Sequence, residues 1–349
     1  MKIIEKLALF AACTLFISCA NEQITDKQNS PIFAKGADVG WLTEMESDNV
    51  LFRNAAGEPM ECMALLKSIG FDAMRFRVWV NPDGGWCGTD DVLAKCLRAR
   101  ELGLRIMVDF HYSDTWADPS HQTKPEAWNS LSVSELCDAV ATHTTEVLRR
   151  LKDNGVEPEW VQVGNETTDG MLWEDGRASS SFINYAALTN AGYSAVKSVF
   201  PDAQVIVHVD CGYDLPRFVW LFDGLRNAGG KWDLIGMSLY PDADNWRERS
   251  ASTVANIDSL SVRYGTNTII CEIGMEASLP DSCNLFITDL LNRTMHMPDS
   301  HCAGIFYWEP QAYGGWKPHN YDAKGWGAYS KGAFNNHGQP TLALQPFNQ

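Results

Sequence analysis

Two glutamates in this sequence each follow directly on a short apolar segment that has the composition of a buried strand. Glu166 closes the segment 161–166, and Glu272 closes the segment 269–272. A carboxyl at the end of such a strand is partly desolvated, and desolvation raises its pKa toward the range where an acid is useful near neutral pH. Both glutamates are therefore candidates for acid–base or nucleophilic work.

Two carboxyls that flank one bond are what glycoside hydrolysis requires, one to protonate the leaving oxygen and one to attack the anomeric carbon or activate water. Two other glutamates compete for these roles. Glu276 lies only four residues beyond Glu272 but past Gly274, further into a loop, and Glu309 follows the last apolar segment. The sequence therefore favours the pair Glu166 and Glu272.

Metal chemistry is the other use of clustered acidic and histidine side chains. His111 and His208 could act as ligands, but neither an H-x-H nor an H-E-x-x-H spacing is present, and no C-x-x-C pair occurs. No required cofactor is expected.

The elements that would carry these residues alternate along the chain. Eight segments resemble strands, several of them continuously apolar as in parallel sheets covered on both faces: 32–38, 73–79, 104–110, 159–164, 204–209, 233–238, 267–271 and 303–308. Helical patterns lie between them at 58–69, 90–102, 181–200, 215–228 and 250–264. The strongest starts at Ser132, has Glu135 at capping-box spacing, and stops at Asn154-Gly155.

Eight strands that alternate with helices predict a single (β/α)8 barrel. The alternative is an open doubly wound sheet, which is disfavoured because no Gly-x-Gly-x-x-Gly turn follows the first strand. Chemistry in such a barrel lies at the carboxyl ends of the strands. Reading those ends adds the following polar and aromatic residues to the glutamates: Asp38, Arg75, Arg77, Trp79, Asn81, Asp109, His111, Asp114, Asn165, His208, Asp210, Tyr240, Trp308 and Glu309.

Composition narrows the class of substrate. The formal net charge of −16 argues against binding to nucleic acid and makes a polyanionic substrate less expected. Thirteen tryptophans are present, and several, such as Trp41, Trp116 and Trp326, lie near Gly, Asp or Asn rather than in periodic core patterns. Loop-placed indoles beside polar groups favour a groove that binds sugar rings.

The first 19 residues resemble an export signal. Lys2 and Lys6 precede an apolar run that is too short to span a bilayer. A small residue before Cys19 closes this run, as in bacterial lipoproteins, so Cys19 is the predicted lipidation site, with ordinary cleavage nearby as the alternative. Residues 20–31 read as a tether and 32–349 as the catalytic barrel. We expect a monomeric outer-membrane or cell-surface lipoprotein, or else a periplasmic or secreted protein, that contacts membrane only through its lipid.

Several motifs resemble those of glycoside hydrolase family 53, the arabinogalactan endo-β-1,4-galactanases, within the clan of retaining (β/α)8 glycosidases. The resemblance covers about residues 32–330 and rests on 36–39, 75–82, 162–166, 208–210, 240–241, 306–310 and above all 109–119. It implies that Glu166 is the general acid/base and Glu272 the nucleophile. It implies that Asn165 binds the sugar 2-hydroxyl, that Tyr240 orients Glu272, and that Arg75 keeps Glu272 ionised. Substrate-binding positions would include Asp38, Trp79, His111, Asp114, Trp116, His208 and Trp308.

The sequence departs from the family pattern at two positions. Ile273 follows the nucleophile where the family usually has Thr, and Leu239 stands where Tyr is usual. Some bacterial members hold a structural calcium ion in a late loop. The residues here that could supply ligands lack convincing spacing: Asp242, Asp244, His319, Asn320 and Asp322.

The resemblance implies cleavage of internal β-1,4-galactosidic bonds in plant cell-wall galactan, with galacto-oligosaccharides as products. Two alternatives stay open. One is another β-1,4-glycanase on the same barrel, such as a mannanase or cellulase. The other is a surface glycan-binding lipoprotein with an inactive barrel, which would be expected to have lost one of the two carboxylates.

Overall fold

The structure of the chain, a computed structural model, describes residues 33–348. The predicted leader 1–19 with Cys19 and the predicted tether 20–31 lie outside the described residues. Within 33–348, no helix has both the length and the apolar character needed to cross a membrane.

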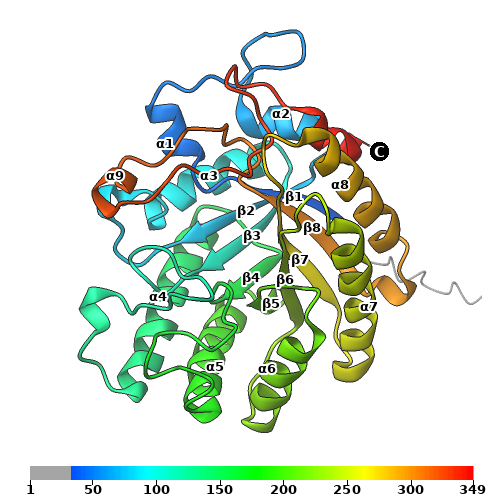
Figure 1. Cartoon of the computed structure of the whole chain (residues 1–349). Coiled ribbons are helices and arrows are strands. Elements are labelled where there is room, and N and C mark those ends of the chain that lie inside the picture. The colour runs from blue at the N-terminus through cyan, green and yellow to red at the C-terminus, as the bar shows by residue number, and fades with distance from the viewer. Residues whose placement is uncertain (1–32, 349) are drawn as a thin grey trace, which may run out of the picture. The chain divides into compact units, whose positions relative to one another are not determined.

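Eight parallel strands close into a single barrel in chain order, and the helices surround it (Figure 1). Asp38 pairs with Arg75 on one side and with Trp308 on the other, so the first and last strands meet. The predicted (β/α)8 barrel is confirmed, and the open doubly wound sheet is wrong. Each predicted strand lies within two residues of an observed one: β1 (Ala34–Asp38), β2 (Ala73–Val78), β3 (Arg105–Phe110), β4 (Trp160–Val163), β5 (Gln204–Val209), β6 (Leu234–Leu239), β7 (Thr268–Ile273) and β8 (Cys302–Trp308).

The helices follow the strands around the barrel. They are α1 (Leu42–Ser47), α2 (Cys62–Ser68), α3 (Thr89–Glu101), α4 (Val133–Asp153), α5 (Phe182–Val199), α6 (Leu215–Asn227), α7 (Trp246–Tyr264), α8 (Pro280–Thr294) and α9 (Tyr321–Lys324). The capping box of α4 is present, with Ser132 and Glu135 bonded reciprocally. Sequence analysis does not predict α8, although its buried Phe286, Ile287 and Leu290 recur at helical spacing.

An apolar layer fills the barrel below the carboxyl ends of the strands. It comprises Ala34, Ala73, Met107, Trp160, Ile206, Leu234, Ile269, Cys271 and Phe306. Phe306 lies edge-on to Trp160 with ring centroids 5.9 Å apart. Gly36 makes room for it, because a Cβ there would lie 2.1 Å from the Phe306 ring. This packed floor gives the layer above it a rigid base.

Above the floor lies a layer of buried charges. Arg75, Arg77, Asp38, Asp109 and Glu309 are all 0% exposed. Arg75 bonds to Asp38 at 2.8 Å, and Arg77 forms an ion pair with Glu309. Burial makes each pair depend on both partners, since a lone charge left in this layer would be unsolvated.

Replacing Arg77 by Met should therefore lower the free energy of unfolding by about 3–5 kcal/mol, because Glu309 then loses its cation inside the protein. Urea denaturation measures the change. The matched control is Arg98→Met, which removes the partly exposed ion pairs of Arg98 with Glu46 and Glu61 and should cost about 1 kcal/mol or less. Equal losses of unfolding free energy in the two variants would contradict the dependence of Glu309 on its buried partner Arg77.

Candidate active site

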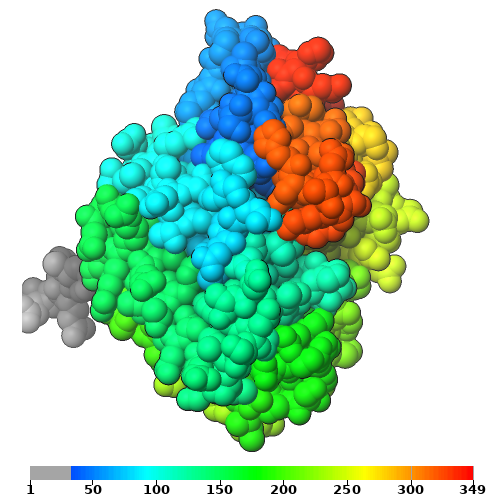
Figure 2. Space-filling model, turned by 90° about the vertical axis from the view of Figure 1, so that its left-hand side faces the viewer, coloured from blue at the N-terminus to red at the C-terminus, as the bar shows by residue number. Residues whose placement is uncertain are grey.

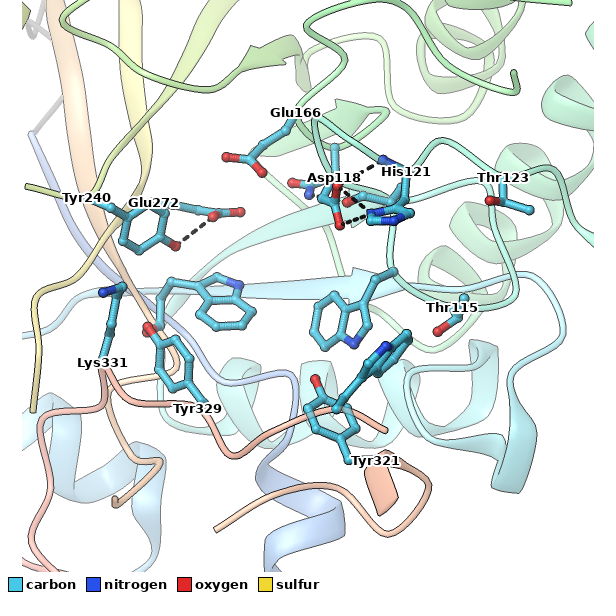
Figure 3. A pocket seen from close by; sticks show the side chains of 15 residues that line it. Thr115, Asp118, His121, Thr123, Glu166, Tyr240, Glu272, Tyr321, Tyr329 and Lys331 are labelled. Carbon is cyan, nitrogen blue, oxygen red and sulfur yellow. Dashed lines mark hydrogen bonds and ion pairs between the residues drawn. The ribbon is translucent and has the colours of Figure 1, made fainter. Parts of the chain in front are cut away.

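A cavity of about 660 Å³ opens at the carboxyl ends of the strands and contains both glutamates (Figure 3). Glu166 lies three residues past the end of β4, and Glu272 lies near the end of β7. The cavity is lined by Thr115, Trp116, Ala117, Asp118, His121, Thr123, Asn165, Glu166, Tyr240, Glu272, Trp308, Tyr321, Trp326, Tyr329 and Lys331.

Glu272 is 5% exposed, and both of its carboxylate oxygens have partners. Arg75 Nη2 lies 2.9 Å from Oε1, and the Tyr240 hydroxyl donates to Oε2 at 2.7 Å. Burial raises the pKa of Glu272 to about 7, while the Arg75 cation and the Tyr240 hydrogen bond oppose this rise. Glu272 is thus a carboxylate held in position by two donors.

Glu166 has a different environment. Its backbone takes a positive φ of 44°, a strained conformation for a residue with a Cβ. Ser238 Oγ donates to Oε1 at 2.6 Å. Burial and then the negative charge of Glu272 raise the pKa of Glu166 well above its ordinary value. Because the pKa of Glu166 is raised further, a proton shared by the pair resides on Glu166, and Glu272 ionises first.

Arg75 is the centre of the network beneath the two glutamates. Besides Glu272 it contacts Asp38, Asp109 at 2.9 Å, Gln162 at 2.8 Å and Asn165 at 2.9 Å. Burial alone would lower the pKa of this guanidinium, but the surrounding carboxylates raise it well above its ordinary value. The cation in turn holds the pKa of Asp109 down at about 2, against the effect of burial.

Aromatic rings form much of the cavity wall. The buried Trp41 packs edge-on against lining rings, with centroids 5.8 Å from Trp116 and 5.1 Å from Trp308. The Arg77 guanidinium lies over the ring of Trp116 at 4.5 Å. The exposed ring faces of this wall offer the apolar surface that a sugar ring needs.

The ten residues predicted to bind substrate divide into two groups. Four line the cavity: Trp116, Asn165, Tyr240 and Trp308. The other six lie behind the lining or beside it: Asp38, Arg75, Trp79, His111, Asp114 and His208. Asp114 accepts backbone N–H bonds from Asn81 and Glu126 in a neighbouring hollow. His111 accepts from the Ala117 N–H, so it supports the lining loop.

The two competing glutamates are placed elsewhere. Glu276 forms an ion pair with Lys331 at 2.6 Å, and hydrogen bonds from Lys331 lower its pKa. Glu309 is buried against Arg77, where desolvation raises its pKa to about 7. Neither lines the cavity.

Sequence reasoning missed part of the lining that comes from long loops. Tyr321, Tyr329 and Lys331 follow β8, and on the surface this segment (orange) lies against the segments after β2 and β3 (cyan; Figure 2). Lys324 Nζ and Thr115 Oγ1 are 3.5 Å apart at this junction. The carboxyl ends of the strands predict only the first residues after each strand. Side chains further along a loop that folds back over the cavity leave no such signal in the sequence.

Within residues 33–348, no group of three or more His, Cys, Asp or Glu side chains is arranged to hold a metal ion. Three of the five candidate calcium ligands have protein partners: Asp242 with Asn245, Asp322 with Lys317, and His319 with Asp48.

A (β/α)8 barrel whose mouth holds two unlike carboxyls beside an aromatic wall defines a glycosyl hydrolase. The chain belongs to glycosyl hydrolase family 53, whose model matches residues 34–347. Members of this family need no cofactor.

The chain is also similar to individual proteins and to a solved structure. The chain is 34% identical over 308 residues to an uncharacterised protein of Niallia circulans, covering 80% of this chain and 83% of that protein. It is 30% identical over 303 residues to a probable arabinogalactan endo-beta-1,4-galactanase A of Neosartorya fischeri. This match covers 79% of this chain and 83% of that protein. A solved structure described as one of two fungal beta-1,4-galactanases superposes with a TM-score of 0.81 at 26% identity, covering 91% of this chain and 99% of that one.

The two shifted carboxyls predict a bell-shaped pH dependence of kcat/KM, because one must be ionised and the other protonated. Activity should rise as pH passes about 7, where Glu272 loses its proton. It should fall again at higher pH, where Glu166 loses its own. Initial rates on a soluble oligosaccharide across the pH range measure both limbs. Glu276→Gln should leave the profile unchanged. An acid limb at the ordinary carboxyl value of 4.5 would contradict the raised pKa of Glu272.

Proposed function

We propose that the protein is a retaining endo-β-1,4-galactanase that cleaves internal bonds of galactan and type I arabinogalactan. The observation that carries this proposal is the pair Glu166 and Glu272, held in one cavity with different hydrogen-bond partners. The choice of substrate is supported by the relatives whose names include arabinogalactan endo-beta-1,4-galactanase.

The reaction would proceed in two displacements. In the first, Glu272 attacks the anomeric carbon while Glu166 gives its proton to the glycosidic oxygen, so the bond to the leaving sugar breaks and a glycosyl ester forms on Glu272. In the second, Glu166 takes a proton from water, which attacks the same carbon and releases Glu272. Two inversions retain the configuration.

The neighbouring residues have distinct roles in this scheme. Asn165 lines the cavity and is fixed by Arg75 and the Ala117 carbonyl, which suits it to bind the 2-hydroxyl of the reacting sugar. Tyr240 and Arg75 orient Glu272 through the two bonds described above. Trp116 and Trp308 offer ring faces for stacking, while Asp38, Trp79, His111 and His208 hold these groups in place from behind or beside them. Asp114 instead fixes the backbone of Asn81 and Glu126 beside the cavity.

A panel of galactan, arabinogalactan, mannan and cellulose tests the activity by reducing-end release, with the products separated by size. We expect short galacto-oligosaccharides from galactan and not from mannan or cellulose. Glu166→Gln and Glu272→Gln should each lower kcat on galactan by at least about 100-fold, since each removes a group that acts on the reacting bond.

The matched control is Glu276→Gln, which neutralises a glutamate four residues from Glu272 but outside the cavity and should keep activity. Activity in Glu272→Gln with loss in Glu276→Gln would overturn the choice of nucleophile. Hydrolysis of mannan or cellulose instead would overturn the substrate, and no hydrolysis of any polymer would favour a glycan-binding protein.

We also propose that Cys19 carries a lipid that anchors the enzyme at the cell surface, on the basis of the leader sequence alone. Wild-type protein should sediment with membranes of the producing bacterium, and Cys19→Ala should shift it to the soluble fraction, because the acyl chains would be absent. Protease added to whole cells should digest the wild-type protein. Unchanged sedimentation of Cys19→Ala would contradict the anchor, and protection from protease would place it inside the envelope.

A further inference from the structure

A chain of hydrogen bonds runs from Glu166 into the barrel. Ser238 Oγ lies 2.6 Å from Glu166 Oε1, His208 Nε2 lies 2.8 Å from Ser238 Oγ, and Gln162 Nε2 lies 3.0 Å from His208 Nδ1. Ser238, His208 and Gln162 are at most 1% exposed, so these groups have no bulk water as an alternative partner.

The orientation of Gln162 is determined by its other neighbours. Arg75 Nε can only donate, so the amide oxygen of Gln162 faces it at 2.8 Å. Asp109 at 2.9 Å accepts from the amide nitrogen, whose second hydrogen is then directed at His208. His208 Nδ1 is therefore an acceptor.

Two further groups face this ring nitrogen. The backbone N–H of Glu166 is directed at Nδ1 at 3.4 Å and reinforces its role as acceptor. Asn165 Oδ1 lies 3.1 Å away and accepts from Arg75 Nη2 at 2.9 Å; it has a second lone pair, but a proton on Nδ1 would face the N–H groups of both Gln162 and Glu166. Burial and then the positive charge of Arg75 lower the pKa of His208 well below its ordinary value, so the ring is neutral and its single proton is on Nε2.

The direction of the remaining bonds follows. His208 Nε2–H donates to Ser238 Oγ, and the hydroxyl hydrogen of Ser238 is left to donate to Glu166 Oε1. Among the described residues, Ser238 is the only side chain that hydrogen-bonds the Glu166 carboxyl. Oε1 is thus occupied as an acceptor, and Oε2 is the oxygen available for a proton.

We propose that Ser238 is a positioning residue that reserves Oε1 of Glu166 as an acceptor, so that the acid proton is carried on Oε2 and delivered to the glycosidic oxygen. This inference rests on the proposed role of Glu166 as the acid/base. In the first displacement the proton leaves Oε2 for the glycosidic oxygen, and in the second it returns to Oε2 from water. Ser238 keeps its own hydrogen throughout.

Other groups also act on Glu166. The negative charges of Glu272 on β7 and Asp210 after β5 favour its protonated form, and the Arg75 cation on β2 favours its ionised form. The pKa of Tyr240 after β6 is raised well above its ordinary value, so its hydroxyl is neutral. Loss of the Ser238 hydroxyl leaves these charges unchanged and removes the one hydrogen bond that stabilises the carboxylate, so the pKa of Glu166 should rise further.

The test compares two substrates in Ser238→Ala. Galactotetraose has a sugar leaving group that must be protonated, whereas 2,4-dinitrophenyl β-galactobioside releases a stable phenolate without an acid. We expect kcat/KM to fall about 10-fold on galactotetraose and to change by less than about 2-fold on the aryl glycoside. The alkaline limb on galactotetraose should move up by about one pH unit.

Two variants serve as controls. Ser238→Thr keeps a hydroxyl and should restore the alkaline limb of the wild type. Ser250→Ala removes another buried serine hydroxyl, on α7 and without a partner, and should leave both substrates unaffected. Equal losses on both substrates, or an alkaline limb that does not move, would overturn the proposal and leave Ser238 a structural role. Full activity of Glu166→Gln on galactotetraose would instead show that the acid/base assignment itself fails.

A second measurement does not depend on activity. Nitrogen-15 NMR of imidazole-labelled wild-type enzyme reports which ring nitrogen of each histidine carries hydrogen, and His208→Gln identifies the His208 signals. We expect the neutral Nε2–H form throughout the pH range in which the enzyme is active. A neutral Nδ1–H form or a charged ring would reverse the chain of donors and overturn the proposal.

Discussion

The structure depends on one buried cation. Arg75 has no exposed surface, yet it reaches Asp38 on β1, Asp109 on β3, Gln162 and Asn165 on or directly after β4, and Glu272 on β7. A guanidinium presents its donors in a rigid fork, so each bond constrains the direction of the others. Strands that are far apart in the sequence are thereby held in fixed positions at the mouth of the barrel. The two glutamates are placed correspondingly precisely.

The two glutamates differ because their partners differ. Glu272 faces the cation and a tyrosine hydroxyl, and both stabilise its charge. Glu166 faces a neutral serine and the negative charge of Glu272, and its charged form is correspondingly disfavoured. Desolvation is the largest effect on both carboxyls, and the neighbouring charges then act on them in opposite directions. The acid and the nucleophile proposed for this site can then coexist at one pH.

Much of the fold and of the candidate site could be predicted from the order of residues along the chain. Period and length of the apolar runs identify all eight strands, and the rule that parallel strands end at one edge of the barrel brings Glu166, Glu272, Arg75 and Asn165 together. The rule does not distinguish a residue that lines the cavity from one that lies behind it. His208 and His111 end strands as Asn165 does, but their rings are enclosed by Gln162, Ser238 and Ala117, which no spacing reveals.

The barrel and the carboxylate pair can be read from the sequence, because both follow from local composition combined with one geometric rule of parallel sheets. The remaining features depend on tertiary contacts. The lining from Tyr321, Tyr329 and Lys331 depends on how a long loop folds back. The proton positions on His208 and Ser238 depend on which donors Arg75 and Asp109 leave free. Both are contacts between residues distant in the chain, where many partners are compatible with the sequence and packing selects one.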